Sequence, residues 1–222
     1  MDKKIIEIFN RWADQYDNDI ELAEKENDWL YQNYSKILKI IILKIKKYCS
    51  PKDKKIIIDI GAGTGNLLMM ASKEGYSIIG VEPSAKMCSK IKNKGICCQI
   101  IRGDFLCLPF KFSTVDVIVS SYAWHHLSHQ DKLKSIDVMQ QILRTNGVII
   151  IADLMFASQR SRQELISKLK QEKKMDLIAD IESEHYGDIQ MLEVEFRKRG
   201  FDFYSHRLTK LVWLIEAQLL TR

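Results

Sequence analysis

Three glycines at alternate positions constrain this chain more than any other feature of its sequence. They stand in Gly61-Ala62-Gly63-Thr64-Gly65, directly after Ile56–Ile60, a short β-branched block typical of a buried parallel strand. Glycine permits a tight strand-to-helix turn and removes the side chains that would keep a ligand away from the peptide N–H groups. The segment predicts a ligand crevice at the end of that strand, or otherwise a tight turn that binds nothing.

An acidic residue stands where such a turn needs one to bind a sugar. Glu82 ends the second expected strand, 21 positions after Gly61, close to the spacing of about 20 at which a carboxylate accepts both hydroxyls of a ribose. The glycines are spaced GxGxG, and Asn66 follows them, whereas dinucleotide enzymes usually carry GxGxxG beside a pyrophosphate. The pattern favours a ribose-bearing ligand with an amino-acid tail over NAD.

A second acidic residue follows the third expected strand. Asp104 and Phe105 come directly after Arg102-Gly103, and in a sheet of this type the third strand lies beside the second, so its end faces the same crevice. We expect Asp104 to accept from the amino group of an adenine, with Phe105 offering its backbone N–H and a ring face. The alternative is a solvated turn residue beside a core phenylalanine.

Strands and helices alternate from residue 51 onward, which predicts an α/β fold with a doubly wound, mostly parallel sheet. Residues 1–50 have helical periodicity and form an N-terminal helical cap of the same domain, and 51–222 form the Rossmann-like domain. Residues 154–187 are a charged, helix-prone insertion expected to cover part of the crevice. The chain ends in two strands only a few residues apart, which predicts one antiparallel strand near the sheet edge. The expected strands are 56–60, 77–81, 96–101, 115–120, 148–152, 201–207 and 211–217. Residues 1–50 contain two helical runs, and a helix that Ser128 caps, with Asp131 three positions later, is expected to end at Asn146-Gly147.

Composition narrows the class of protein. The 222 residues are 46% hydrophobic and 28% charged, as in ordinary globular proteins. No apolar run approaches the ~20 residues of a membrane span, and the first ten residues carry lysines without an apolar region behind them, so we expect a cytoplasmic protein without a cleaved leader. The net charge of +5 is dispersed, which permits nucleic-acid binding without indicating it. The five cysteines show no CxxC spacing and are expected to be reduced.

These motifs resemble the class I S-adenosylmethionine (SAM)-dependent methyltransferases over nearly the whole chain. Residues 57–66 are similar to the glycine motif of that family, 81–84 to its acidic motif and 103–105 to its adenine-binding motif. More narrowly, the chain resembles the small bacterial YrrT-like methyltransferases, whose substrate is unassigned. The segments that carry this closer resemblance are 12–17, 82–87, 120–127, 184–186 and 212–217.

The resemblance implies a seven-stranded sheet with SAM, or its product S-adenosylhomocysteine (SAH), across the ends of the first strands. It assigns Gly61 and Gly63 to the methionine end, Glu82 to the ribose and Asp104 to the adenine, and it suggests that the N-terminal helix closes over the cofactor. The cofactor-binding set implied in this way is Trp12, Tyr16, Asp59, Gly61, Ala62, Gly63, Gly65, Glu82, Pro83, Met87, Asp104, Phe105 and Ser120.

The residues that follow the fourth expected strand are the candidates for contact with the methyl acceptor. A sulfonium carries an activated methyl group, so a protein chiefly has to align the acceptor behind it, and a base is needed only where the acceptor must lose a proton. Tyr122, His125 and His126 are the candidate catalytic residues by position, and ordinary loop histidines are the alternative. His125 and His129 have a possible i, i+4 metal spacing, but no acidic or thiol ligand completes it, so we expect no metal site.

Several functions remain open on the sequence alone. A methyltransferase with a small-molecule acceptor is favoured because no RNA-binding domain is appended. A tRNA or protein methyltransferase is the second candidate, favoured if the lysines gather around the pocket mouth. A non-catalytic sensor that binds SAM or SAH is the third candidate, and an NAD-dependent oxidoreductase is the fourth. The fourth strand ends in Ser-Ser-Tyr, without the Asp-Pro-Pro-Tyr, Asn-Pro-Pro-Tyr or Pro-Cys of DNA amino and cytosine C5 methyltransferases, which makes those classes poor candidates. The oligomeric state is not readable.

Overall fold

A single mixed sheet organises the chain in the computed structural model, which describes residues 3–26 and 28–220. Its strands follow the order β3-β2-β1-β4-β5-β8-β7, and the short β6 pairs with the end of β5. The strands are β1 (Ile57–Ile60), β2 (Ile78–Val81), β3 (Ile100–Ile101), β4 (Val115–Ser121), β5 (Leu143–Phe156), β6 (Gly187–Asp188), β7 (Phe201–Arg207) and β8 (Val212–Leu219).

The strand directions confirm the predicted α/β class. Strands β1 to β5 run parallel, while β8 is antiparallel to both of its neighbours, β5 and β7. β8 is therefore the one antiparallel strand of the seven-strand path, and β6 is an eighth strand that the sequence did not predict. All of β1 is buried, as expected for a central parallel strand covered on both faces.

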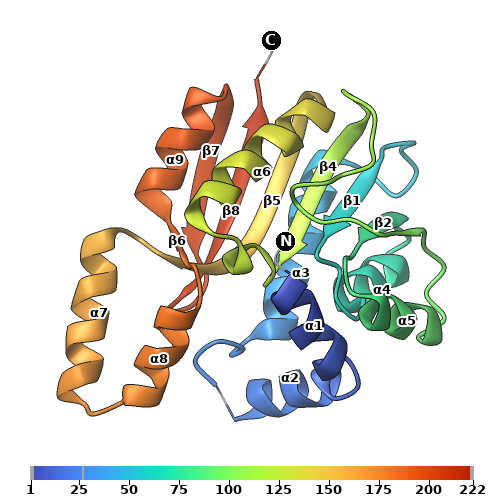
Figure 1. Ribbon diagram of the computed structural model, residues 1–222. Coiled ribbons are helices and arrows are strands. Elements are labelled where there is room, and N and C mark those ends of the chain that lie inside the picture. Colours follow the sequence, from blue (N-terminus) through green and yellow to red (C-terminus); the bar gives the residue numbers. More distant parts are fainter. Residues whose placement is uncertain (1–2, 27, 221–222) are drawn as a thin grey trace.

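Helices cover both faces of this sheet (Figure 1). Ile57 packs into a core on one face with residues of α3 and α4, whereas Ile58 and Ile60 pack into the core on the other face with residues of α6 and α9. The helices are α1 (Lys3–Trp12), α2 (Tyr16–Lys25), α3 (Tyr34–Tyr48), α4 (Asn66–Lys73), α5 (Ala85–Asn93), α6 (His129–Ile142), α7 (Gln159–Gln171), α8 (Met175–Ser183) and α9 (Ile189–Lys198), with a short 3₁₀ turn η1 (Trp124–His126).

Two further helical units lie below the sheet in Figure 1, the blue α1 and α2 and the orange α7 and α8. They belong to the predicted N-terminal cap and to the predicted insertion 154–187, although β5 continues to Phe156 before α7 begins. The N-terminal helices therefore face the ends of β1, β2 and β4. Of the described helices, none is both long and apolar enough to span a bilayer.

Two of the predicted boundaries that differ from the structure are explained by single hydrogen bonds. The third strand is only Ile100–Ile101, because the Cys98 N–H donates to the Ile96 carbonyl (2.9 Å) and turns the chain before it joins the sheet. The helix expected to end at Asn146-Gly147 ends at Ile142. Its last carbonyls are taken by the loop before β4, where the Thr114 N–H donates to the Ile142 carbonyl (2.9 Å).

Candidate functional site

The glycine turn follows β1 directly, as the sequence predicts. Gly61 has a φ of +76°, and a Cβ on it would lie 2.4 Å from the Ala123 Cβ, so only glycine lets the segment after β4 approach. Gly63 has a φ of +55° with no atom within 4 Å of the position its Cβ would take. The turn is therefore packed tightly at Gly61 and left open at Gly63.

Glu82 joins this turn to the start of α5. Its carboxylate accepts hydrogen bonds from the N–H groups of Gly63 (2.9 Å) and Ser84 (2.7 Å), and the residue is buried. Burial raises the pKa of Glu82 to about 7, against the opposing effect of those two N–H donors. Near neutral pH this carboxyl is therefore poised between its protonated and ionised forms.

Asp59 lies inside β1. It is buried, and its Oδ1 has no hydrogen-bond partner among the described residues. Burial, followed by the nearby charge of Glu82, raises the pKa of Asp59 to about 8, so the protonated form predominates at neutral pH. Asp59 is not part of the cavity wall described next.

One cavity lies between the glycine turn, the start of α5, the N-terminal helices and the segment after β4. Nine of the residues singled out from the sequence line it: Tyr16, Gly61, Ala62, Gly63, Glu82, Pro83, Met87, Tyr122 and His126. The sequence did not single out the other wall residues, which are Ile6, Phe9, Tyr34, Thr64, Asn66, Leu67, Ser84, Ser121 and Ala123. We call this hollow the donor cavity.

The other sequence candidates lie around the donor cavity without lining it; they are Trp12, Asp59, Gly65, Asp104, Phe105, Ser120 and His125. Phe105 is fully buried beneath the turn, with a ring carbon 3.9 Å from where a Gly61 Cβ would stand. Asp104 accepts a hydrogen bond from the Leu106 N–H (2.8 Å), and the Ser120 hydroxyl donates to the Ile60 carbonyl (2.8 Å). Ser120 thereby ties β4 to the end of β1.

Polar contacts attach the N-terminal helices to the rim of the cavity. The Asn10 side-chain oxygen, on α1, accepts from the Ser84 hydroxyl (2.8 Å) and from the Lys86 N–H (3.3 Å). Asp17, on α2, accepts from the Thr64 hydroxyl (2.6 Å) at the glycine turn. Sequence reasoning assigned no role to Asn10 or to Asp17, although Asp17 stands in a segment that carried the family resemblance.

Asp17 is also held by the first residue of α4 and by the residue that follows α5. It accepts from the Asn66 side-chain amide (3.1 Å) and pairs with the Lys94 ammonium (2.7 Å). Trp12 and Tyr16, the two aromatic candidates of this region, contact each other edge-on with ring centroids 4.7 Å apart. Of these two, only Tyr16 reaches the cavity wall.

Two further tyrosines, Tyr34 and Tyr122, line the cavity. Tyr122 packs against Tyr31 and Tyr34, with ring centroids 5.6 and 5.3 Å away. Its φ of +50° is uncommon for a bulky side chain, and its hydroxyl is buried without a hydrogen-bond partner among the described residues. A buried, unpaired hydroxyl costs free energy, so the fold is destabilised locally at Tyr122.

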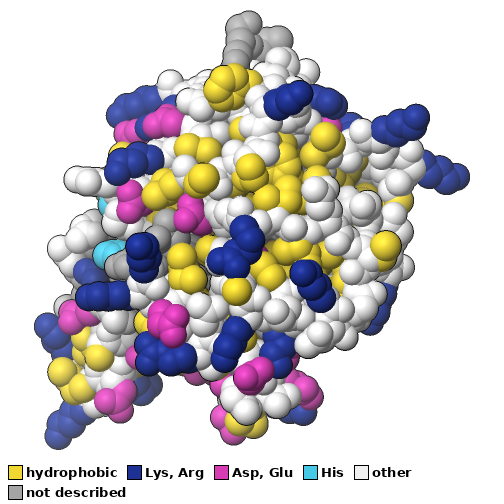
Figure 2. All heavy atoms as spheres, turned by 45° about the vertical axis from the view of Figure 1, so that its right-hand side comes forward, with side chains coloured by type: hydrophobic (Ala, Val, Ile, Leu, Met, Phe, Trp, Pro, Cys, Tyr) yellow, Lys and Arg dark blue, Asp and Glu magenta, His cyan; other side chains and the backbone are white. Residues whose placement is uncertain are grey.

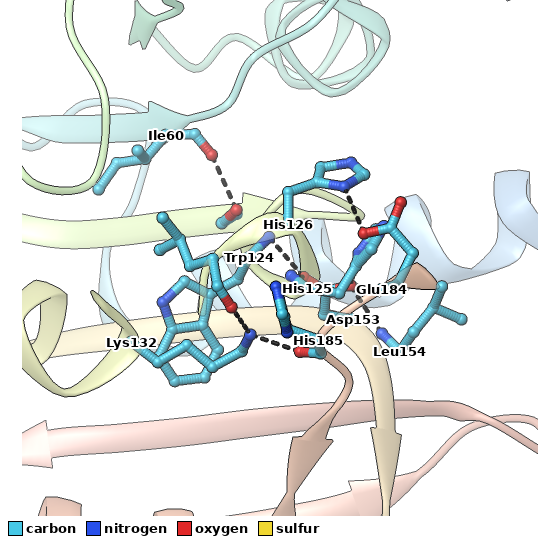
Figure 3. A network of polar contacts seen from close by, with 11 residues as sticks. Ile60, Trp124, His125, His126, Lys132, Asp153, Leu154, Glu184 and His185 are labelled. Carbon is cyan, nitrogen blue, oxygen red and sulfur yellow. Dashed lines mark hydrogen bonds and ion pairs between the residues drawn. The ribbon is translucent and has the colours of Figure 1, made fainter. Parts of the chain in front are cut away.

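The two candidate histidines each contact a carboxylate (Figure 3). Nδ1 of His125 lies 2.5 Å from Oδ1 of Asp153, and Nδ1 of His126 lies 3.0 Å from Oε2 of Glu184. Burial and the neighbouring His125 lower the pKa of His126. Burial alone would raise the pKa of Asp153, but His125 holds it below its usual value.

Glu184 is the residue that sequence reasoning missed here. The i, i+4 pair does not assemble: His129 is exposed, and among the described residues Glu184 completes a cluster with His125 and His126 instead. The 58 positions between His126 and Glu184 are closed by the fold, which the spacing of histidines along one helix cannot reveal. The only sequence signal was that residues 184–186 belong to the segments of family resemblance.

Comparisons with known proteins identify the family of the chain. A methyltransferase domain family matches residues 57–147. An uncharacterised methyltransferase of Bacillus pumilus is 34% identical over 98% of this chain and 99% of its own length, and one of Alkaliphilus oremlandii is 33% identical over 95% of each.

Solved structures show the same fold at low sequence identity. A SAM-dependent methyltransferase of Thermotoga maritima, described as a possible histamine N-methyltransferase, has a TM-score of 0.64 at 18% identity and covers 96% of this chain and 98% of its own. DhpI in complex with SAH has a TM-score of 0.68 at 10% identity and covers 98% of this chain and 96% of its own.

Proposed function

Because the chain belongs to the SAM-dependent methyltransferases, we propose that it transfers the methyl group of SAM to a small-molecule acceptor. The observation that carries this proposal is the donor cavity, whose wall brings Gly63, Glu82 and Tyr122 together. A ribose, a sulfonium and an acceptor would then lie along one cavity, with the acceptor beside Tyr122.

On the donor side, Glu82 would accept hydrogen bonds from the ribose hydroxyls, and Gly61, Ala62 and Gly63 would face the methionine part. Asp104 and Phe105 follow β3 and are the candidates for the adenine. We assign Tyr16, Pro83 and Met87 to the wall around the nucleoside, because they line the cavity beside Glu82. Trp12, Asp59, Gly65 and Ser120 would act by holding the wall residues in place.

The transfer itself needs little covalent help from the protein. A lone pair of the acceptor attacks the methyl carbon, the carbon–sulfur bond breaks, and its electron pair stays on sulfur, which leaves SAH. The protein has to hold the acceptor behind the methyl group and keep water out. Tyr122 would orient the acceptor, and the proton of a hydroxyl, thiol or ammonium acceptor would leave toward His125 and His126.

A small acceptor also fits the surface charge. Lys and Arg side chains are scattered over the face shown in Figure 2 and do not gather into one basic patch there. The helices of the N-terminal cap and of the insertion are short and carry charge pairs of their own, such as Lys25 with Glu21 on α2 and Arg160 with Glu164 on α7. Recognition of tRNA or of a large protein is therefore not the favoured reading.

Methyl transfer into a fractionated extract tests the proposal. The protein is incubated with SAM carrying a labelled methyl group and with cell extract separated by size, and label is expected in a fraction of small molecules only. The Glu82→Gln variant is the matched control and should transfer at least tenfold less. Label in tRNA or protein would overturn the small-molecule acceptor, and silence in every fraction despite tight SAH binding would favour a sensor. If the protein binds NAD tightly and does not bind SAH, it does not have the methyltransferase activity proposed here.

A further inference from the structure

The side chains of His125, His126 and Glu184 form a group to which the proposed function assigns no role beyond the uptake of the acceptor's proton by the histidines. One nitrogen from each histidine and one carboxylate oxygen of Glu184 all lie within 4.8 Å of one another, and the two imidazole centroids are 4.0 Å apart. We propose that this cluster binds a divalent transition-metal ion of the zinc class. Its role in catalysis rests on the proposed function, but the binding of the ion does not.

The donor set indicates the kind of ion. Two imidazole nitrogens and one carboxylate oxygen are a set used by catalytic zinc sites, which leave a fourth position for water or substrate. Magnesium and calcium prefer sites made of oxygen ligands only, so nitrogen donors favour zinc or a neighbouring transition metal. No described cysteine joins the group, so it does not have the closed ligand set of a typical structural zinc site.

A buried carboxylate stands behind one of the proposed ligands. Asp153 holds Nδ1 of His125 at 2.5 Å, which leaves Nε2 of that ring as the nitrogen for an ion. The same carboxylate accepts from the backbone N–H groups of Trp124 (2.6 Å) and His125 (3.0 Å), so its position is fixed. Metal-binding histidines almost always have such a partner, which sets the ring orientation and raises the basicity of the ligating nitrogen.

The fold brings the ligands together without an ion. The His185 N–H donates to the His125 carbonyl (3.1 Å), which joins the segment after α8 to η1. Lys132, buried on α6, donates to the carbonyls of both Leu127 and His185 and so links the same two segments a second time (Figure 3). A site prepared in this way loses less conformational entropy when the ion binds.

The location relates the ion to the acceptor. His126 lines the donor cavity, while Glu184 lines a second, more polar hollow formed with α7 and the start of α9. The proposed ion lies between the two hollows. A hydroxyl or thiol bound at its fourth position would lose its proton to solvent water more readily, because a bound cation favours the anion. The histidines would then serve as ligands, and water would take the proton.

Cobalt(II) is the probe for this site, because its visible absorption reports nitrogen and oxygen ligation independently of methyl transfer. Tag-free full-length protein, cleared of metal by a chelator, is titrated with cobalt(II) and then with zinc(II). We expect one equivalent to bind and zinc to displace it. Glu184→Gln and His126→Ala should each weaken cobalt binding at least tenfold, and Asp153→Asn should weaken it by about 10- to 100-fold.

His129→Ala is the matched control, since this exposed histidine lies close in sequence but outside the cluster, and its cobalt affinity should equal that of the wild type. Equal affinities in the wild type, Glu184→Gln and His126→Ala would overturn the site, as would the absence of saturable binding. Circular dichroism on the same samples confirms that each variant is folded. Calorimetry of the wild type with SAH separates the two ideas, because absence of SAH binding counts against the proposed function and absence of cobalt binding counts against the metal site.

Discussion

At the scale of single residues, the protonation of Glu82 should make SAH binding depend on pH. In the free protein burial raises its pKa to about 7, whereas the ribose hydroxyls need the ionised form as acceptor. Below pH 7 the carboxyl must release a proton before SAH binds, so the dissociation constant should rise by up to about tenfold per pH unit there. Above pH 7 the affinity should level off.

Calorimetry between pH 5.5 and 8.5 measures this dependence. Glu82→Gln cannot ionise, so its SAH affinity should be flat with pH. Loss of a hydrogen bond to a charged group costs about 1.5–3 kcal/mol, which places the variant roughly 10- to 100-fold below the wild type at pH 8. A wild-type affinity that falls as pH rises from 6 to 8 would contradict the assignment of Glu82 to the ribose.

Two neighbouring glycines should fail in different ways. In Gly61→Ala the new methyl group would meet the Ala123 Cβ at 2.4 Å, so the protein should lose several kcal/mol of stability, roughly 2–4. In Gly63→Ala the methyl group meets nothing within 4 Å, and only the left-handed backbone costs about 1–2 kcal/mol. That methyl group enters the donor cavity, so SAH binding should fall at least tenfold. Urea unfolding and SAH calorimetry on both variants check this contrast, which equal stability losses would refute.

The residue scale also shows how far the sequence could be read. Glycines and an acid at a strand end have spacings fixed by the strand–turn–helix unit itself, so Gly61, Gly63 and Glu82 were found before the structure. Asp17 and Glu184 act across 47 and 58 positions, respectively, on Thr64 and His126. Such pairs depend on how separate elements pack, and no local period or spacing records them.

At the scale of elements, α1 is held only weakly by packing. None of its residues is buried, and the polar contacts of Asn10 with Ser84 and Lys86 attach it to α5. Asn10→Ala should therefore release α1 from the cavity rim and speed SAH dissociation by about 5- to 30-fold, since one or two hydrogen bonds of about 1 kcal/mol are lost. Global stability should change by less than about 1 kcal/mol.

Stopped-flow fluorescence follows this release, because Trp12 lies on the same helix. Arg11→Ala is the matched control: its guanidinium is exposed and, within the described part of the chain, pairs with Glu7 at 3.9 Å. An exposed pair of this kind contributes little, so the control should keep the wild-type rate. Equal dissociation rates for Asn10→Ala and Arg11→Ala would exclude α1 as a cover of the cofactor.

Element boundaries were predictable where a local signal marks them. Ser128 caps α6 by accepting the Asp131 N–H (3.1 Å), as its sequence pattern indicates, and β7 begins and ends as expected at Phe201 and Arg207. The N-terminal region, expected as two helical runs, forms three helices, since Asn33 with its φ of +63° starts α3 afresh. The shortening of β3 comes from a local turn between Ile96 and Cys98, and the early end of α6 comes from a hydrogen bond between separate segments. Hydrophobic periodicity records neither.

At the scale of the whole molecule, the two helical units below the sheet, α1 with α2 and α7 with α8, adjoin different parts of the site (Figure 1). The N-terminal helices contact the turn that would hold the donor, whereas the segment that follows α7 and α8 supplies Glu184 beside the acceptor end. If the two duties are separate, SAH should slow the opening of the first unit alone, because a ligand stabilises the elements whose closed form it contacts.

Hydrogen exchange measured by mass spectrometry distinguishes the two units. On adding SAH at about 100 times its dissociation constant, opening of the elements that contact it should become less favourable by about 2.7 kcal/mol. Exchange in α1, α2 and the glycine turn should slow by roughly 100-fold, an effect limited to amides that exchange through opening of the cavity. Peptides from α7 and α8 should keep their rates, because Leu169, Ile178 and Ile181 already bury those helices in the core without any ligand. Equal protection of both units would mean that they close together, and the donor and acceptor sides would then be coupled through the sheet.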